Sequence, residues 1–386
     1  MKVTQLHELV NTTMQEVLGE SAVVNEDLTN VVDLGNEIIN TDNLDHYVKK
    51  LVNHIGKVVF VNRVYNGSAP SVLMDSWEFG SILEKISADM PEAQENDTWN
   101  LVDGQSYDDD IFYQPKVSAK FFNSRITFEI PMSFTERQVK ESFSNATQLN
   151  GFISMLVTSV ENAMTVKLDS LVMRTINNMI AETLLNDLTT EEGTLDTTAG
   201  TVKAVNLLAD YNARYGGSLT KAEAITDPDF IKYASYVIGL YTDRISKIST
   251  LFNVGGKARF TPANQLHLVL LSEFAKASTV FLESETVNEA NVKLPNFETV
   301  PYWQGSGEGY GFAETSSIDV TTDSGTVQVD GIIGVMFDRQ AIGITNLDRR
   351  VTSNYNAKAE FYTNYYKFDA GYYNDLNENF VVFFVA

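Results

Sequence analysis

The stretch from Thr147 to Leu188 constrains this chain more than any other part of its sequence. It contains no proline, and Gly151 is its only glycine. Apolar residues recur at near-helical spacing, which predicts one amphipathic helix; they are Ile153, Val157, Val160, Met164, Leu168, Leu171 and Met179. At about 1.5 Å per residue such a helix is on the order of 60 Å long. A helix of that length is unusual in a compact domain and favours an elongated molecule.

The residues ahead of this helix predict a polar arm. Residues 1 to 55 contain two segments with helical patterning, Leu6–Leu18 and Asn43–His54. The second is followed by Val58–Val61, whose apolar run predicts a strand. We therefore expect an N-terminal arm that leads into a folded core.

An extended region follows, from Tyr65 to Ser142. Its clearest element is Arg125–Ile130, in which apolar and polar residues alternate. This period of two predicts a half-exposed antiparallel strand with Ile126, Phe128 and Ile130 on its buried face.

Acidic residues accumulate between Ile86 and Pro115, where no Lys or Arg balances them; they are Asp89, Glu92, Glu95, Asp97, Asp103, Asp108, Asp109 and Asp110. Charge of this density does not easily pack into a core of its own. Two interpretations stay open: a protruding β-loop that needs a partner surface for part of its stability, and an ordinary solvated loop. The run Asp108–Asp110 lacks the alternating spacing of an EF-hand calcium loop, so no metal site is predicted there.

Two further helices have readable starts after the long one. Asp227 can cap a helix with Pro228 in its first turn, and Thr261 can do the same with Pro262. The first helix is predicted to bury one face, made of Phe230, Ala234, Val237, Tyr241, Ile245, Ile248 and Phe252. The second is dominated by the apolar run Leu266–Leu271. Both patterns predict core helices of a central domain.

After Pro301 the pattern predicts β structure. The expected strands are Thr326–Val329, Gly334–Phe337, Lys358–Tyr362 and Phe380–Val385. The last of them is apolar on both faces, which is typical of a strand buried in a sheet. Since the chain has no internal repeat and no Gly/Ser linker, we expect one interwoven structure.

The composition excludes several classes of protein. The 386 residues include no cysteine, which removes disulfides, thiolate metal sites and cysteine nucleophiles. The 28 basic and 51 acidic residues give a formal net charge of −23, which repels phosphate backbones. No apolar run approaches the ~20 residues of a membrane helix, and the N-terminus lacks the pattern of a signal peptide. We expect synthesis in the cytoplasm and no membrane association.

No motif for catalysis or metal binding is present. The four histidines, His7, His46, His54 and His267, are not spaced as ligands or as catalytic partners. The glycine-rich run Gly305–Gly311 is followed by no helix pattern, so we expect a connector and not a phosphate cradle. The aromatic residues between Phe361 and Tyr373 favour packing in a core or a subunit interface. We therefore expect no catalytic residue, no cofactor and no metal.

The order of these parts resembles the major capsid proteins of tailed bacteriophages, whose fold is shared by herpesvirus capsids and encapsulins. A closer similarity lies near the C-terminus, in Val335–Ile344, Arg349–Thr352 and Asn379–Phe383. The resemblance implies an α+β capsid fold with five parts: an N-terminal arm (1–58), an extended loop or β-hairpin (59–142), a spine helix of the peripheral domain (143–190), peripheral and axial domain elements (191–345), and C-terminal strands that return to the peripheral domain (346–386).

The same resemblance implies self-assembly into pentamers and hexamers of an icosahedral phage head. Its contents would be double-stranded DNA held without sequence-specific binding, and portal and scaffolding proteins would be further partners. The protein would reside in the virion after assembly in the host bacterial cytoplasm. By charge alone, Asp108, Asp109 and Asp110 are expected to meet a basic patch on a neighbouring subunit. The candidates for that patch are Arg339, Arg349, Arg350, Lys358 and Lys367.

Two other functions stay open at this point. An encapsulin-like shell protein would enclose cargo enzymes in place of a genome. A carbohydrate-binding or hydrolytic enzyme is the more distant alternative, motivated by the acidic pairs and the aromatic residues, because glycoside hydrolysis depends on two suitably spaced carboxylates.

Overall fold

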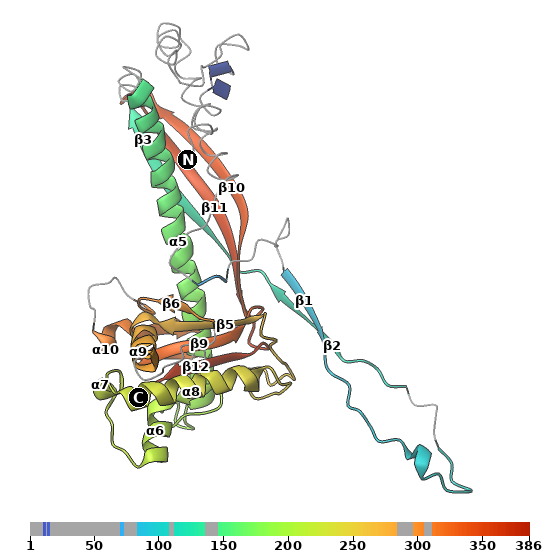
Figure 1. The fold of residues 1–386 in the computed structure, drawn as a ribbon. Coiled ribbons are helices and arrows are strands. Elements are labelled where there is room, and N and C mark those ends of the chain that lie inside the picture. Colours follow the sequence, from blue (N-terminus) through green and yellow to red (C-terminus); the bar gives the residue numbers. More distant parts are fainter. Residues whose placement is uncertain are drawn as a thin grey trace.

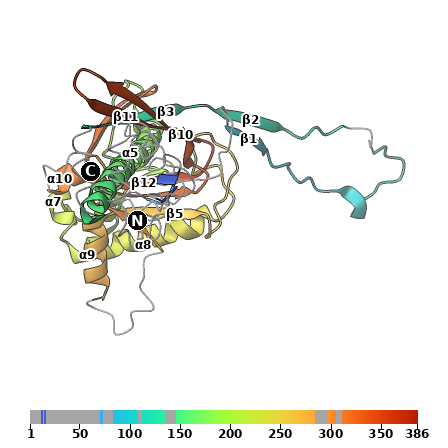
Figure 2. The ribbon, with the colours of Figure 1, turned by 90° about the horizontal axis from the view of Figure 1, so that it is seen from above.

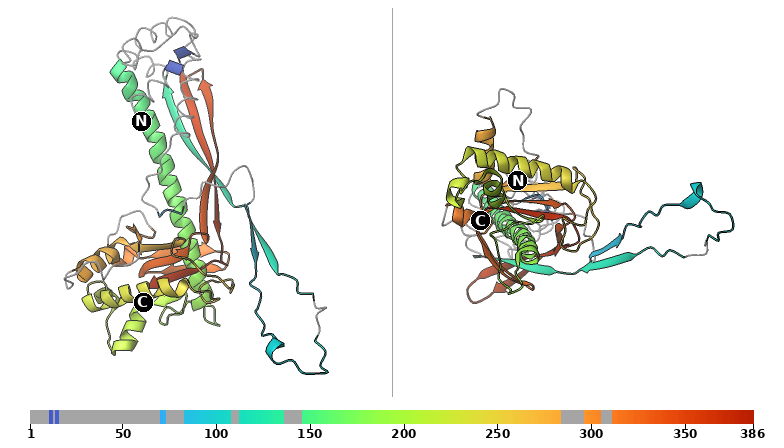
Figure 3. Two further views of the ribbon diagram at one scale, coloured as in Figure 1. Left: turned by 45° about the vertical axis from the view of Figure 1, so that its right-hand side comes forward. Right: turned by 90° about the horizontal axis from the view of Figure 1, so that it is seen from below.

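The structure, a computed structural model, describes residues 11–12, 14–15, 70–72, 83–107, 112–135, 146–283, 296–304 and 311–386. It is elongated, with one long helix running from a narrow end into a wider body (Figure 1). A long loop projects from one side, well beyond the rest of the molecule, in every view (Figures 1, 2 and 3). The predicted helices Leu6–Leu18 and Asn43–His54 and the predicted strand Val58–Val61 lie outside the described residues, apart from four helical residues at 11–12 and 14–15.

Helix α5 (Ala146–Leu188) has 43 residues and confirms the prediction of one long helix. Val160, Met164, Leu168, Leu171 and Met179 are all buried, as their spacing predicted. Thr175 and Thr183 are buried too, and each hydroxyl donates to the carbonyl four residues earlier, so that no polar atom of theirs is left without a partner. The second half of the helix is buried on most of its sides, since Arg174 and Asn186 are the only exposed residues between Leu171 and Leu188.

A three-stranded antiparallel sheet packs along α5. Strand β11 (Phe361–Asn374) lies between β10 (Ile342–Asn356) and β3 (Arg125–Thr135). The strand predicted at Arg125–Ile130 is confirmed, and its apolar residues are the less exposed ones. Phe128 stands opposite Phe368 and the two rings are 5.0 Å apart. Edge strand β10 was not predicted.

The strand predicted at Lys358–Tyr362 is wrong in its first half. Residues 357–360 form the turn between β10 and β11, and β11 begins at Phe361. The reason is local: the side chain of Asn356 accepts hydrogen bonds from the backbone N–H groups of Lys358 and Ala359, each at 3.1 Å. This Asx turn ends β10 at Asn356, so β11 begins only at Phe361.

A five-stranded sheet forms the centre of the body. Its order is β4 (Ala204–Asn206), β12 (Phe380–Phe384), β9 (Ile332–Asp338), β5 (Leu266–Leu271) and β6 (Glu298–Val300). The predicted strands Gly334–Phe337 and Phe380–Val385 are confirmed, and every residue of β12 is buried.

The helix predicted after Thr261 and Pro262 is wrong in its position. Leu266–Leu271 is strand β5, and helix α9 (Ser272–Glu283) begins only afterwards. A short run of consecutive apolar residues suits a strand buried on both faces as well as a helix, and periodicity alone does not separate the two. Here β5 pairs with β9 on one side and β6 on the other, so the sheet decides the outcome.

Both faces of the central sheet carry a core. Alternate residues of β12 face opposite ways: Val382 and Phe384 join the core that contains α5, whereas Val381 and Phe383 join a second core. That second core is closed by α6 (Leu207–Tyr215), α8 (Pro228–Ile245) and α9, with α7 (Lys221–Ala224) beside them. The C-terminal strand therefore ties both halves of the body together.

The start of α8 confirms its prediction. Asp227 caps the helix by accepting a hydrogen bond from the N–H of Phe230 at 2.7 Å, and Pro228 is in the first turn. The predicted apolar face is buried as far as Ile245, where the helix ends. Ile248 lies beyond that end and is exposed, which corrects its assignment to the buried face.

A hairpin of β7 (Ile318–Thr322) and β8 (Gly325–Val329) packs on α5 and confirms the strand predicted at Thr326–Val329. Ahead of it, one turn of helix, α10 (Phe312–Thr315), has Gly311 at its N-cap. A short helix does follow the glycine-rich run, contrary to the sequence expectation. Residues 305–310 of that run lie outside the described residues.

Replacing Gly331 by alanine should destabilise the body. Gly331 has φ +94°, and an added Cβ would meet the carbonyl oxygen of Val385 next to β12. Gly193→Ala is the matched control, because Gly193 also has positive φ, +78°, but has open space around it. We expect a loss of about 1 kcal/mol for the control and roughly 2–4 kcal/mol for Gly331→Ala in thermal unfolding. Equal losses would contradict a close approach at Gly331.

Candidate subunit contact surface

The projecting loop is built on a two-stranded ribbon. Strands β1 (Leu83–Ala88) and β2 (Val117–Phe122) pair antiparallel, and residues 89–116 connect them. A single 3-10 turn, η1 (Asp97–Trp99), is the only regular element among the described residues of this connection. In Figure 3 the connection extends far from the body on both sides of η1. We call residues 83–122 the projecting loop.

The projecting loop exposes a large amount of apolar surface. Trp99 is 94% exposed and Phe112 is 84% exposed. Others on the same loop that are exposed are Ile86, Met90, Leu101, Val102, Tyr107, Tyr113, Val117 and Phe121. Soluble monomers rarely collect so many exposed large apolar side chains on one segment, and such patches mark interaction sites. Only the acidic residues of this stretch were predicted to form contacts, although the apolar residues are interleaved with them.

The ribbon has two unlike faces. Lys85 and Lys120 are direct cross-strand partners and share the face that meets the body. Ile86, Val117 and Phe121 are exposed on the other face. One face of the ribbon is therefore bound within the subunit, and the other presents apolar side chains outward.

Two carboxylates hold the ribbon to the body. Lys85 Nζ lies 2.7 Å from Asp375 Oδ2 and 2.7 Å from Glu378 Oε1, and Lys120 Nζ lies 2.9 Å from Asp375 Oδ1. Arg259 Nε is 3.5 Å from the same Glu378 oxygen. Both acids stand in the turn between β11 and β12, and the side chain of Asp375 is only 2% exposed. We call these five residues the ionic clamp.

The ionic clamp offsets a charge repulsion inside the ribbon. Like charges directly opposite each other on neighbouring strands are destabilising, and Lys85 faces Lys120 in this way. Asp375 accepts a hydrogen bond from each lysine, which replaces the repulsion by two attractions. The carboxylate of Asp375 therefore stabilises the ribbon by bridging the two lysine side chains on one of its faces.

The pKa of Asp375 reflects this position. Burial raises it, but the hydrogen bonds from Lys85 and Lys120 outweigh burial and hold the pKa below its ordinary value of 3.8. A carboxyl group whose pKa is lowered on folding stabilises the fold at pH values above its unfolded pKa. That stabilisation is lost as the pH falls through the lowered, folded pKa, so the clamp is intact at neutral pH.

Two further contacts fix the base of the loop. Asp89 pairs with Lys257 at 2.9 Å, and the hydrogen bond from Lys257 lowers the pKa of Asp89. Asp89 is thus one acid of the loop that does have a counter-ion in its own chain. Phe122 packs on Tyr373 with ring centroids 4.8 Å apart.

The structure does not gather the predicted contact residues into one site. Asp108, Asp109 and Asp110 lie outside the described residues. Arg339 is exposed in the turn between β9 and β10, whereas Arg349 and Arg350 lie within β10. Arg350 pairs with Asp369 at 2.7 Å and with Asp348 at 3.1 Å, so its charge is already engaged inside the subunit. Lys367 likewise pairs with Glu129, at 3.2 Å.

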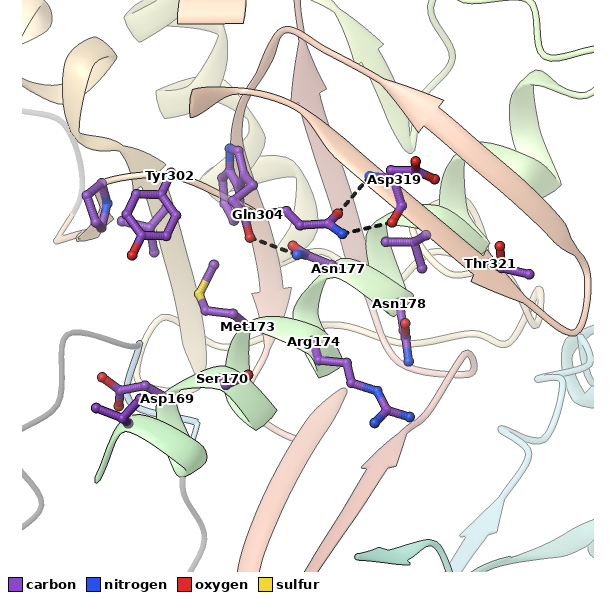
Figure 4. Close-up of a pocket in the computed structure, with 15 residues that line it drawn as sticks. Asp169, Ser170, Met173, Arg174, Asn177, Asn178, Tyr302, Gln304, Asp319 and Thr321 are labelled. Atoms are coloured by element: carbon purple, nitrogen blue, oxygen red, sulfur yellow. Dashed lines mark hydrogen bonds between the residues drawn. The ribbon is translucent and has the colours of Figure 1, made fainter. Parts of the chain in front are cut away.

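A pocket of ≈ 680 Å³ lies alongside α5 (Figure 4). Its walls are α5, the segment that follows β6 and strand β7. Asn177 Nδ2 donates to the carbonyl of Trp303 at 2.8 Å, and the Gln304 side chain exchanges two hydrogen bonds with the backbone of Asp319, at 2.9 and 2.7 Å. These bonds hold the three walls together. We call this cavity the α5 pocket.

Several other side chains in the described ranges contribute to the packing of the core. His267 stacks on Phe337 with ring centroids 5.5 Å apart, and burial lowers its pKa. Tyr362, Tyr366 and Phe368 are buried, which confirms core packing for these aromatics. Burial raises the pKa of Tyr366 to about 12. Within the described ranges no group of acidic and histidine side chains is arranged to hold a metal, and no helix has the length and apolarity to span a bilayer.

Comparisons with known proteins give one family and a set of similar folds. The family model described as Phi29-like phage major capsid protein matches residues 10–384. A capsid structure of Staphylococcus phage Andhra has a TM-score of 0.50 at 8% identity, over 84% of this chain and 86% of that one. A structure of native bacteriophage P68, described as its head fiber and inner core protein gp22, has a TM-score of 0.51 at 9% identity, over 85% and 86%. No curated protein sequence matches the chain.

Replacing Asp375 by asparagine should loosen the projecting loop. The change removes the anion between Lys85 and Lys120, and loss of one partner from a buried ion pair costs about 3 kcal/mol or more. We expect amide hydrogen exchange in β1 and β2 to accelerate at least ~10-fold, with little change in β12. Asp348→Asn is the control, since that acid is 65% exposed and pairs only at the surface. Unchanged exchange in β1 and β2 would refute the clamp.

Proposed function

The chain belongs to the Phi29-like phage major capsid protein family, and from that premise we propose that its copies assemble as pentamers and hexamers into an icosahedral head around double-stranded DNA. It is a capsid shell protein; the observation that carries this is the family match over residues 10–384. An encapsulin-like shell and a carbohydrate-active enzyme are not favoured by a match to a phage capsid family. The family is one of structural proteins, which supports the proposal that the chain has no enzymatic role.

The proposal gives each part of the fold a place in the shell. Helix α5 would be the spine helix, and together with the three-stranded sheet it would form the peripheral domain. The five-stranded sheet with α6, α8 and α9 would be the axial domain. Residues 1–58 would be the N-terminal arm, and the projecting loop would belong to the extended loop. The C-terminal strands of 346–386 would return to the peripheral domain through β11 and most of β10, whereas β12 belongs to the five-stranded sheet.

The projecting loop would then dock on a neighbouring subunit. Its exposed apolar side chains and the outer face of its ribbon support this, because neither has a surface to cover it within the described part of its own subunit. Of the basic residues considered, Arg339 and Lys358 are exposed and no ion pair of theirs is found among the described residues, so these two are the better candidates to meet the acidic loop. Arg350 would first have to leave Asp369.

The proposed partners follow from the same role. Portal and scaffolding proteins would contact the shell, and the packaged DNA would be held without sequence-specific binding, in keeping with the net charge of −23. The protein would be part of the virion after assembly in the host cytoplasm.

Purified recombinant protein, alone or with its scaffolding partner, should form closed shells or rings of five and six subunits. Negative-stain electron microscopy and size-exclusion chromatography measure this directly. A discrete dimer or tetramer that never grows, even when scaffolding protein is added, would contradict the proposed assembly.

Charge reversal of Asp108, Asp109 and Asp110 together to lysine should impair particle formation, because the loop would lose its attraction to a basic neighbour. The yield of particles in a sedimentation gradient is the readout. A triple variant with the same change of charge, Glu191→Lys, Glu192→Lys and Asp323→Lys, places it on exposed turns of the body. If both variants assemble equally well, these three aspartates do not contribute to docking.

A further inference from the structure

The chain contains the dipeptide Asp–Gly twice, in closely matched local sequences. Asp103–Gly104 lies in the projecting loop, Asp330–Gly331 lies just before strand β9, and a valine precedes each pair. In both pairs the glycine has positive φ, +82° at Gly104 and +94° at Gly331. The two places therefore differ mainly in how the fold surrounds them.

This dipeptide can change its own covalent structure. The backbone nitrogen of the glycine attacks the side-chain carboxyl carbon of the aspartate, so that an N–C bond forms, a C–O bond breaks, and one water molecule leaves with the amide proton. Water then opens the succinimide ring at either of its carbonyl groups. One opening restores aspartate, and the other leaves isoaspartate, in which the backbone runs through the side chain. Glycine favours the attack because it has no side chain and adopts many backbone angles.

The reaction needs an unengaged nitrogen and a backbone that can rotate, and Asp103–Gly104 offers both. The two residues are exposed, and a Cβ added at Gly104 would meet nothing within 4 Å. The turn is closed by a bond from the N–H of Gln105 to the carbonyl of Val102 at 3.2 Å, and the N–H of Val102 donates to Tyr107 Oη at 3.0 Å. Among the described residues, neither the N–H of Gly104 nor the carboxylate of Asp103 has a hydrogen-bond partner.

Asp330–Gly331, by contrast, is held at the atoms that would react. The N–H of Gly331 donates to Ser316 Oγ at 2.8 Å. Lys221 Nζ lies 2.5 Å from Asp330 Oδ1 and donates to the Asp330 carbonyl at 2.9 Å. A Cβ added at Gly331 would meet the carbonyl oxygen of Val385, so the backbone has little room to rotate. The side chain of Asp330 is nevertheless 51% exposed, so access of water does not distinguish the two sites.

We propose that Asp103–Gly104 is a site of spontaneous isoaspartate formation in the folded subunit, and that the fold protects Asp330–Gly331 from the same reaction. The change would add one methylene group to the backbone of the turn and would place the carboxylate of residue 103 on a shorter branch. It would therefore alter the shape of the projecting loop without a change in mass or charge. This inference does not depend on the proposed shell function.

Peptide mapping by mass spectrometry measures both sites in one sample, with electron-transfer fragmentation to distinguish isoaspartate from aspartate. Purified, unassembled subunits are incubated at neutral pH for increasing times. We expect isoaspartate to accumulate at residue 103 at least ~10-fold faster than at residue 330, because the second site must open locally before it can react. Asp103→Glu is the control variant. It keeps the charge, but its longer side chain would have to close a less favourable six-membered ring, so the signal at position 103 should disappear.

The same incubation in concentrated guanidinium chloride separates the effect of the fold from that of the sequence. In the unfolded chain both sites should form isoaspartate at similar rates, since each aspartate stands between a valine and a glycine. Similar rates at the two sites in the folded subunit, or no isoaspartate at residue 103, would overturn the proposal. A difference that persists undiminished in the unfolded chain would overturn it too, because it would then arise from the sequence and not from the fold.

Discussion

The constraint on which this structure depends is that the projecting loop cannot bury its own apolar side chains. The loop carries Trp99 and Phe112, which are almost fully exposed, and among its described residues between 89 and 116 the turn η1 is the only regular element. Within one subunit this arrangement leaves apolar surface in contact with water, which is unfavourable in free energy. It becomes favourable when the same surface is covered by another copy, which is what a family of shell-forming proteins provides.

The body gives the projecting loop a rigid base. Helix α5 gives the molecule its length, and the central sheet, with a core on each face, gives it a stable base. The ionic clamp then joins the loop to that base at Asp375 and Glu378, immediately before the buried strand β12. The loop is therefore fixed at its base next to a fully buried strand of the body.

The helices and strands whose formation depends mainly on residues close in sequence could be predicted from the sequence. Helix α5 follows from its periodic apolar residues, the start of α8 from Asp227 and Pro228, and β12 from its apolar run. Strand β5 could not be separated from a helix, because a short run of mostly apolar residues fits both and only its pairing with β6 and β9 decides. Strand β10 was missed because it is an edge strand with many polar residues.

The candidate contact surface was predicted only in part. The acidic loop was recognised, but the ionic clamp joins Lys85, Lys120 and Asp375, which are far apart in the chain and show no local pattern. The α5 pocket likewise unites residues from α5, the segment after β6 and β7. Such sites become visible only when the fold brings their residues together.

The central claim is that the projecting loop is completed by a second copy. Hydrogen exchange measured by mass spectrometry, on unassembled subunits and on assembled particles, tests it most directly. We expect the amides of residues 89–107 and 112–116 to become protected on assembly, while those of β12 are protected in both states. Equal, fast exchange of the loop in subunits and particles would contradict the account, because it would mean that the loop stays in solvent in the finished shell.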